Sequence, residues 1–165
     1  MNHEIKIEIA GLGIIFYSPF AVAHIADGTN FLSSSFWKPD EVAKYVNQCR
    51  IPAFCTGSPG TYKLRIFDGP YPDSIIETSA RTIRLGIEVR DLSICFRDLY
   101  DLMDWRSSCP QEQNVSLADG FYRVTVMTRL PASGILGDNQ EIDMYFEKYL
   151  EMPKLNWPGV PELII

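Results

Sequence analysis

The chain has 165 residues, of which 46% are apolar and 12% aromatic, and its 15 basic and 21 acidic side chains leave a net charge of −6. A chain of this size buries roughly 70% of its unfolded surface, which excludes disorder and predicts one domain over residues 1–165. The longest apolar stretch, 12–23, is shorter than the about 20 residues that a membrane span needs, and an acidic chain without basic clusters argues against nucleic acid as a direct partner.

Strand patterns dominate the first half of the chain. Residues 4–9 alternate charged and apolar side chains, which predicts a half-buried strand, and the apolar stretch 12–17 predicts a more buried one. The Gly- and Ser-rich stretch 24–35 predicts a loop. Residues 39–49 combine a first-turn proline, two acidic residues and apolar residues at helical spacing, which predicts the one main helix. Residues 61–67 alternate again, and 75–76 are interpreted as the start of a short edge strand.

The second half of the chain shows the same alternating strand patterns. Alternation over 83–90 and 92–97 predicts two strands, 99–103 predicts a helical turn, and 121–128 and 142–146 predict two further strands. The proline-rich tail from residue 153 is expected to lie extended across the body. These elements predict a mostly β fold, an antiparallel sandwich or flattened barrel of about six to eight strands with one main helix.

Two pairs of stretches match within the chain. Residues 7–20 and 87–100 coincide at five positions at an offset of 80 residues, and 60–66 and 120–126 both continue from a glycine into a strand at an offset of 60. These matches indicate an internal duplication with halves 1–80 and 81–165. The unequal offsets are equally typical of chance matching between amphipathic hairpins. Both interpretations stay open.

The last third of the chain carries a family resemblance. The run Ser-Leu-Ala-Asp-Gly-Phe-Tyr-Arg-Val-Thr-Val over 116–126 precedes an acidic, aromatic stretch at 141–150 and an end rich in Trp and Pro. This resembles small bacterial proteins of unknown function that carry a Gly-x-Tyr-Arg-Val-x-Val strand and an acidic, Pro/Trp-rich tail. The chain is also distantly similar to all-β nuclease-inhibitor and immunity-type proteins. The resemblance implies a bacterial, non-catalytic protein and assigns no site residue.

Asp98, Asp101 and Asp104 recur at every third residue. On a helix this spacing brings the carboxylates within about one turn of each other. Such a cluster meets a basic partner, binds a hard cation or forms the solvated face of an amphipathic helix. We predict a binding face for a basic partner and no metal site.

Four aromatic residues fall in predicted loops. Phe31, Phe36 and Trp37 lie in or beside the serine-rich stretch, and Tyr71 lies in a proline-rich turn. Aromatic side chains on loops supply contact area at a small entropic cost, which favours a binding surface. The alternative is that they close the open ends of the sandwich.

No pattern indicates catalysis, a cofactor or zinc. His24 and Asp27 lack a nucleophile signature such as Gly-x-Ser-x-Gly, and the four cysteines form no Cys-x-x-Cys pair. A leader ending at Ala23 would carry two glutamates against one lysine, the wrong charge for a signal peptide. We therefore predict a cytoplasmic protein with four reduced thiols, against two disulfides in an exported protein.

The sequence favours a non-catalytic interaction protein, of the inhibitor or immunity type, whose acidic surface meets a basic partner such as a toxin or nuclease. The alternative is a small-ligand or carbohydrate-binding β-sandwich, or a weak enzyme, with the loop aromatics lining a pocket. The pattern carries no signal for an oligomeric state.

Overall fold

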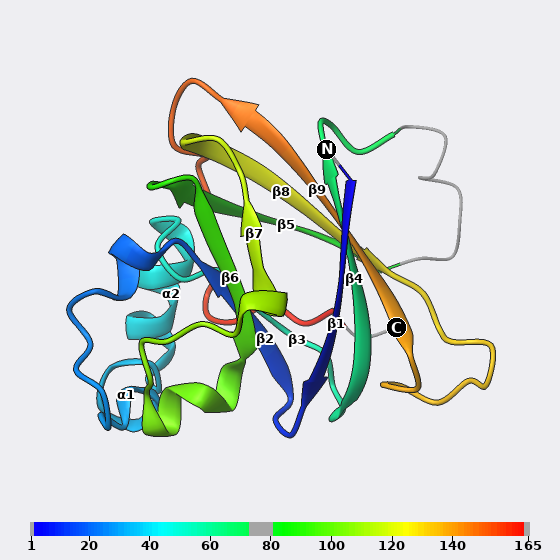
Figure 1. Cartoon of the computed structure of the whole chain (residues 1–165), viewed down its shortest axis with the longest axis horizontal. Coiled ribbons are helices and arrows are strands. Elements are labelled where there is room, and N and C mark those ends of the chain that lie inside the picture. The colour runs from blue at the N-terminus through cyan, green and yellow to red at the C-terminus, as the bar shows by residue number, and fades with distance from the viewer. Residues whose placement is uncertain (1, 73–80, 164–165) are drawn as a thin grey trace.

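Two β-sheets stacked face to face form the body of the protein (Figure 1). The computed structural model describes residues 2–72 and 81–163, so the edge strand predicted at 75–76 lies outside the described residues. The larger sheet has the order β1 (Asn2–Ile9), β4 (Gly60–Asp68), β9 (Gln140–Tyr149), β8 (Gly120–Thr128), β5 (Arg81–Val89). The smaller sheet has the order β3 (Ala53–Cys55), β2 (Gly13–Tyr17), β6 (Ser93–Asp98), β7 (Asn114–Ser116).

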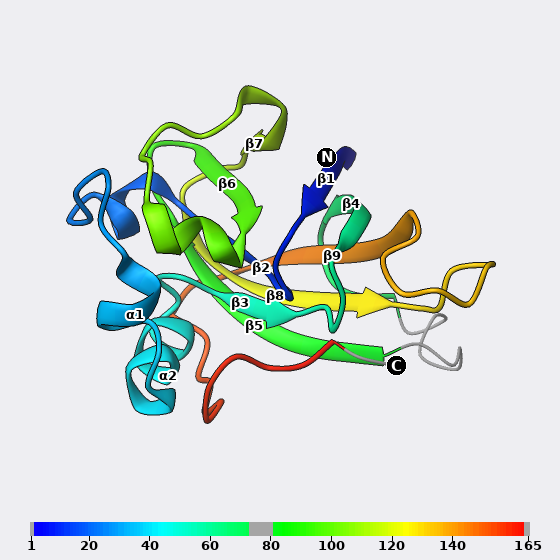
Figure 2. The ribbon, with the colours of Figure 1, turned by 90° about the horizontal axis from the view of Figure 1, so that it is seen from below.

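Most of the short helices gather at one end of the sandwich (Figure 2). The described helices are η1 (Pro19–Val22), α1 (Phe31–Ser35), α2 (Pro39–Asn47), η3 (Leu99–Asp104) and η4 (Gln111–Gln113), of which η4 lies against β1 and β6. The main helix is α2, which begins at Pro39 and has Asp40 and Glu41 in its first turn, where carboxylates complement the helix dipole. None of the described helices has the length and apolar character that a membrane span requires.

The predicted β-sandwich with one main helix is confirmed, and two open sheets take the place of the flattened barrel. Three details differ from the prediction. Nine strands are described in place of six to eight, because the three-residue strands β3 and β7 are too short to show the alternation that predicts a strand. Strand β4 pairs with β9 in parallel, so the larger sheet is mixed and not purely antiparallel. Residues 31–35, expected in a loop, form α1, because the Asn30 side chain accepts a hydrogen bond from Ser33 N at 3.1 Å and caps the turn.

The core lies between the sheets. Strand β1 buries Ile5, Ile7 and Ile9 and exposes the charged residues between them, as its alternation predicts. Phe16 of β2 contacts Phe146 of β9 edge to face at 6.1 Å between ring centroids, which joins the two sheets across the core.

The two halves of the chain have corresponding strands. β1 and β5 form the two edges of the larger sheet with β4 and β8 next to them, and β2 and β6 form the centre of the smaller sheet. Gly60 and Gly120 open β4 and β8 with φ values of 147° and 145°, a conformation that favours glycine. The Tyr62 and Tyr122 hydroxyls each donate to a carbonyl four residues earlier, both at 2.7 Å. These correspondences are those that a duplication would leave, and the duplication stays a proposal.

Candidate functional site

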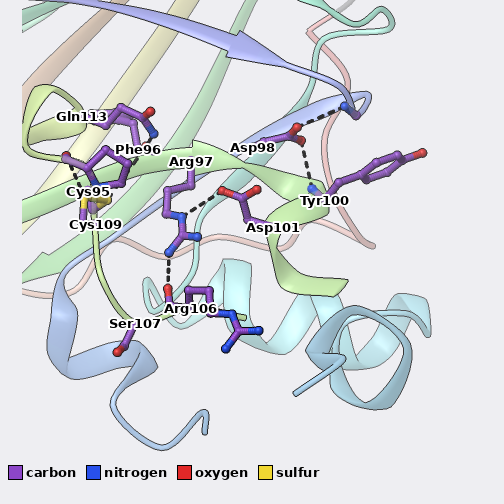
Figure 3. A network of polar contacts seen from close by, with 12 residues as sticks. Cys95, Phe96, Arg97, Asp98, Tyr100, Asp101, Arg106, Ser107, Cys109 and Gln113 are labelled. Carbon is purple, nitrogen blue, oxygen red and sulfur yellow. Dashed lines mark hydrogen bonds and ion pairs between the residues drawn. A yellow bond between two sulfur atoms is a disulfide. The ribbon is translucent and has the colours of Figure 1, made fainter. Parts of the chain in front are cut away.

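The acidic stretch begins where β6 ends and continues as the 3-10 helix η3, directly beside a buried arginine (Figure 3). Arg97 is only 6% exposed. Its Nε donates to the Asp101 carboxylate at 2.9 Å, and its Nη1 donates to the backbone carbonyl of Arg106. A buried guanidinium needs such partners, because desolvating an unpaired charge is costly. Arg97 therefore ties η3 to the segment that follows it.

A tryptophan seals the inner side of this network. Trp105 is fully buried, its ring lies 4.6 Å from the Arg97 guanidinium carbon, and it contacts Tyr17 edge to face at 5.5 Å. Its backbone N–H donates to Thr29 O at 3.0 Å, and its carbonyl accepts from Gly28 N at 2.7 Å. Burial raises the pKa of Tyr17, although Arg97 acts in the opposite direction. The residues after η3 are thus anchored to the loop before α1.

A disulfide closes the same segment. Cys95 and Cys109 are joined across a sequence separation of 14 residues, so the prediction of four reduced thiols is wrong. The described free cysteines are Cys49 and Cys55. Spacing could not reveal this bond, because Cys109 reaches Cys95 only when the chain turns back after η3. Burial raises the pKa of the Cys49 thiol to about 12.

The three predicted carboxylates share one short segment but have different surroundings. Asp98 is the N-cap of η3 and accepts from Tyr100 N at 3.0 Å, and it also accepts from Ala10 N at 2.8 Å and Gly11 N at 3.2 Å. The Ser18 hydroxyl, 80 residues earlier, accepts from Arg90 N at 2.9 Å directly after the end of β5. Asp98 therefore holds the turn between β1 and β2.

The other two carboxylates point outward. Asp101 pairs with Arg97 and keeps 39% of its side chain exposed, and Asp104 pairs with Arg106 at 3.2 Å with 69% exposed. Within residues 2–72 and 81–163, no group of three His, Cys, Asp or Glu side chains is placed to hold a metal ion. The Asp104–Arg106 pair is exposed on both sides and contributes little to stability, so Asp104 is open to a competing cation. Asp101 neutralises the buried Arg97 and offers only its exposed part to a partner.

Replacing Asp98 with alanine is expected to lower the free energy of unfolding by about 1–2 kcal/mol, because three backbone N–H groups lose their acceptor. Asp104→Ala, the matched control on the same segment, is expected to change it by less than about 0.5 kcal/mol. Urea unfolding followed by circular dichroism measures both. Equal losses for the two variants would contradict the structural assignment of Asp98.

An apolar groove of about 330 Å³ opens beside η3. Leu12, Trp37 and Tyr100 are its exposed rim, at 46%, 69% and 38% exposure. The full lining is Leu12, Leu32, Phe36, Trp37, Pro39, Val42, Leu99, Tyr100, Gly159 and Val160. A Cβ on Gly11 would lie 2.7 Å from the Tyr100 ring, so only glycine permits this close approach. Exposed apolar residues around a concavity are typical of interaction sites.

The four loop aromatics are not brought together. Phe31 and Phe36 are buried and pack with Tyr45, at 5.5 Å and 5.9 Å between ring centroids. Trp37 is exposed at the groove, which Phe36 also lines. Tyr71 lies elsewhere, against Tyr145 of β9 at 5.3 Å.

Sequence reasoning missed three parts of this site. The sequence predicts Leu12 in a buried strand, 99–103 in a helical turn and 159–160 in an extended tail, and it singles out none of these as binding residues. The available signal was an apolar residue between two glycines, Gly11-Leu12-Gly13. Two glycines indicate a turn, and a leucine in a turn is not buried by the face of a sheet.

No protein-family model and no curated protein matches the sequence. Two solved structures are similar. One is described as "Crocagin biosynthetic gene J", with a TM-score of 0.56 and 12% identity over 88% of this chain and 97% of the other. The second is ComJ from Bacillus subtilis, an inhibitor of the DNA-degrading activity of NucA, with a TM-score of 0.48 and 12% identity over 90% and 96% of the two chains. The first likeness shows a shared fold, and the second is too low to carry an argument.

Proposed function

We propose that this chain is a non-catalytic interaction protein whose groove receives an apolar side chain of a basic partner protein. The observation that carries the proposal is the exposed rim of Leu12, Trp37 and Tyr100 around a preformed apolar concavity. Large aromatic side chains at the centre of an interface supply most of its binding free energy.

Charge complementarity supports a basic partner. Asp101 and Asp104 lie on η3, and Asp40 and Glu41 lie in the first turn of α2. Both helices line the groove. Basic side chains next to an apolar anchor would meet these carboxylates and would speed association at low salt. Toxins and nucleases that bind nucleic acid have basic surfaces, and we propose a partner of this class.

The proposal also concerns the cellular compartment, because the compartment sets the redox state of the Cys95–Cys109 bond. The sequence predicts the cytoplasm, where disulfides are usually reduced. The Cys95–Cys109 bond closes the segment that carries η3, so its reduction would loosen one wall of the groove. We propose that the redox state of this bond sets how well the groove is formed.

A synthetic peptide of lysines around one leucine is the probe that tests the groove. We expect this peptide to bind and to change the emission of the exposed Trp37, and the same peptide with glutamates to bind at least about tenfold more weakly. Tyr100→Ala and Leu12→Ser are expected to weaken binding by about tenfold each, because they remove rim contacts. Ile135→Ala, at a 64% exposed residue outside the groove lining, is the matched control.

Two results would overturn the proposal. One is equal binding of the basic and acidic peptides, which would leave no role for the carboxylates. The other is an equal effect of Tyr100→Ala and Ile135→Ala, which would place the peptide outside the groove. Capture from bacterial extract with the wild-type chain and the Tyr100→Ala variant tests the partner class: proteins lost with the variant should be basic, and a set of acidic proteins would contradict it.

A further inference from the structure

A second concavity lies on the outer face of the larger sheet, away from the core. The C-terminal tail crosses this face, running from the end of β9 past α2 towards β3 (Figure 2). Trp157 fixes the tail in place: its indole Nε1 donates to Arg84 O at 2.7 Å, and its backbone N–H and carbonyl both bond the Asn47 side chain at 2.8 Å. These hydrogen bonds fix the tail against the outer face of the sheet.

Strand β5 is shaped to receive the tail. Gly86 lies on the outer face, and a Cβ there would be 3.3 Å from both Leu155 Cδ1 and Pro153 Cγ, and 2.6 Å from Cys49 Sγ. A larger residue would collide with Cys49 Sγ and would also crowd Leu155 and Pro153 of the tail. The tail approaches the sheet closely at Gly86. Beside this contact, an open space remains between the tail and the side chains of the neighbouring strands.

That space is a pocket of about 350 Å³ with three cations in its lining. The lining residues are Arg84, Arg123, Tyr149, Pro153, Lys154, Leu155, Asn156 and Trp157. Arg123 of β8 pairs with Gly86 of β5, two residues from Arg84, so both arginine side chains emerge on the outer face. Lys154 comes from the tail.

The positive charge in this pocket is only partly neutralised. Arg123 Nη2 pairs with Glu147 at 2.6 Å, whereas Arg84 and Lys154 have no acidic partner among the residues that the structure describes. Three cations and one carboxylate leave a local charge of +2. This is a concentrated positive patch on a chain whose net charge is −6.

Arg123 also has unused hydrogen-bonding capacity. Its Nε is buried and has no partner within the described chain. A guanidinium has five N–H donors, and a buried donor without an acceptor in a native structure calls for a water or an ion. The guanidinium carbon lies 5.2 Å from the centre of the Tyr149 ring, which holds its plane beside the pocket.

We propose that this pocket binds a small phosphomonoester carried on a flat organic group. A phosphomonoester is close to a dianion at neutral pH and matches the local charge of +2, and two arginine forks suit its oxygen atoms. Tyr149 and Trp157 offer apolar aromatic surface to the organic group. The tail limits the space to a small molecule, since the volume lies at the lower end of the range for such sites.

Adenosine monophosphate, adenosine and inorganic phosphate are the probes, and isothermal titration calorimetry on the full chain is the measurement. We expect the monophosphate to bind at least about tenfold more tightly than adenosine, because only the phosphate engages the cations. We expect it to bind more tightly than inorganic phosphate, because the ring contacts the aromatic wall. Equal affinity for the monophosphate and adenosine, or no binding of either, would overturn the proposal, and equal affinity for the monophosphate and inorganic phosphate would overturn its aromatic part.

Variants at exposed or half-buried positions keep the test independent of folding. Arg84→Gln with Lys154→Gln is expected to weaken the monophosphate by about tenfold or more, and Glu147→Gln is expected to strengthen it, since it removes the neutralising carboxylate. Arg129→Gln with Lys44→Gln changes the net charge equally at exposed positions outside this pocket and should leave binding unchanged. Equal weakening by both double variants would mean nonspecific attraction and would overturn the site.

Discussion

Trp105→Ala is expected to lower the free energy of unfolding by about 3–5 kcal/mol, the typical loss for a large aromatic residue in a core. Trp105 is fully buried. The truncation opens a cavity beside Tyr17 and removes the ring that lies 4.6 Å from the Arg97 guanidinium carbon, which leaves that buried charge with fewer partners.

Urea unfolding followed by far-UV circular dichroism measures this loss, and Trp37→Ala is the matched control. Trp37 is 69% exposed, so its removal should change the free energy of unfolding by less than about 0.5 kcal/mol. The two variants thus separate stability from binding. Trp105→Ala should unfold at a lower urea concentration, and Trp37→Ala should stay folded but bind the peptide more weakly at the groove. Similar stabilities for both variants would show that the segment after η3 is not anchored as described.

Reduction of the Cys95–Cys109 disulfide is expected to lower the free energy of unfolding by about 3 kcal/mol, the value for a closed loop of about 15 residues. The physical reason is that the bond restricts the unfolded chain between the two cysteines. Because that loop contains η3 and Trp105, the same reduction should weaken peptide binding at the groove.

Thiol titration provides the direct count. Unfolding without reductant should release two thiols, and unfolding after reduction should release four. In the native protein Cys49 should not react at neutral pH, because it is buried and its thiol pKa is raised to about 12. Cys109→Ser should reproduce the destabilisation, while Cys55→Ser should have a smaller effect. A count of four thiols without reductant would refute the bond.

The local sequence pattern predicts most of the secondary structure. The alternation over 83–90 and 121–128 corresponds to β5 and β8, and the first-turn proline at residue 39 begins α2 as expected. These signals work because side-chain periodicity depends on neighbours along the chain. Of the predicted loop aromatics, Phe36 and Trp37 line the groove and Trp37 is exposed, while their role in binding stays a prediction.

The contacts between elements that are distant in the sequence became known only from the tertiary structure. The parallel pairing of β4 with β9, the bond between Cys95 and Cys109, and the burial of Arg97 all depend on residues brought together from separate parts of the chain. Asp98, Asp101 and Asp104 show the same limit: their spacing places them on one segment, but only the fold assigns Asp98 to a turn and leaves Asp104 in solvent. Local periodicity and composition predict seven of the nine described strands, the main helix and the acidic character, whereas β3 and β7 are too short to show alternation. The groove, the tail pocket and the role of each carboxylate came from long-range packing, which no local pattern encodes.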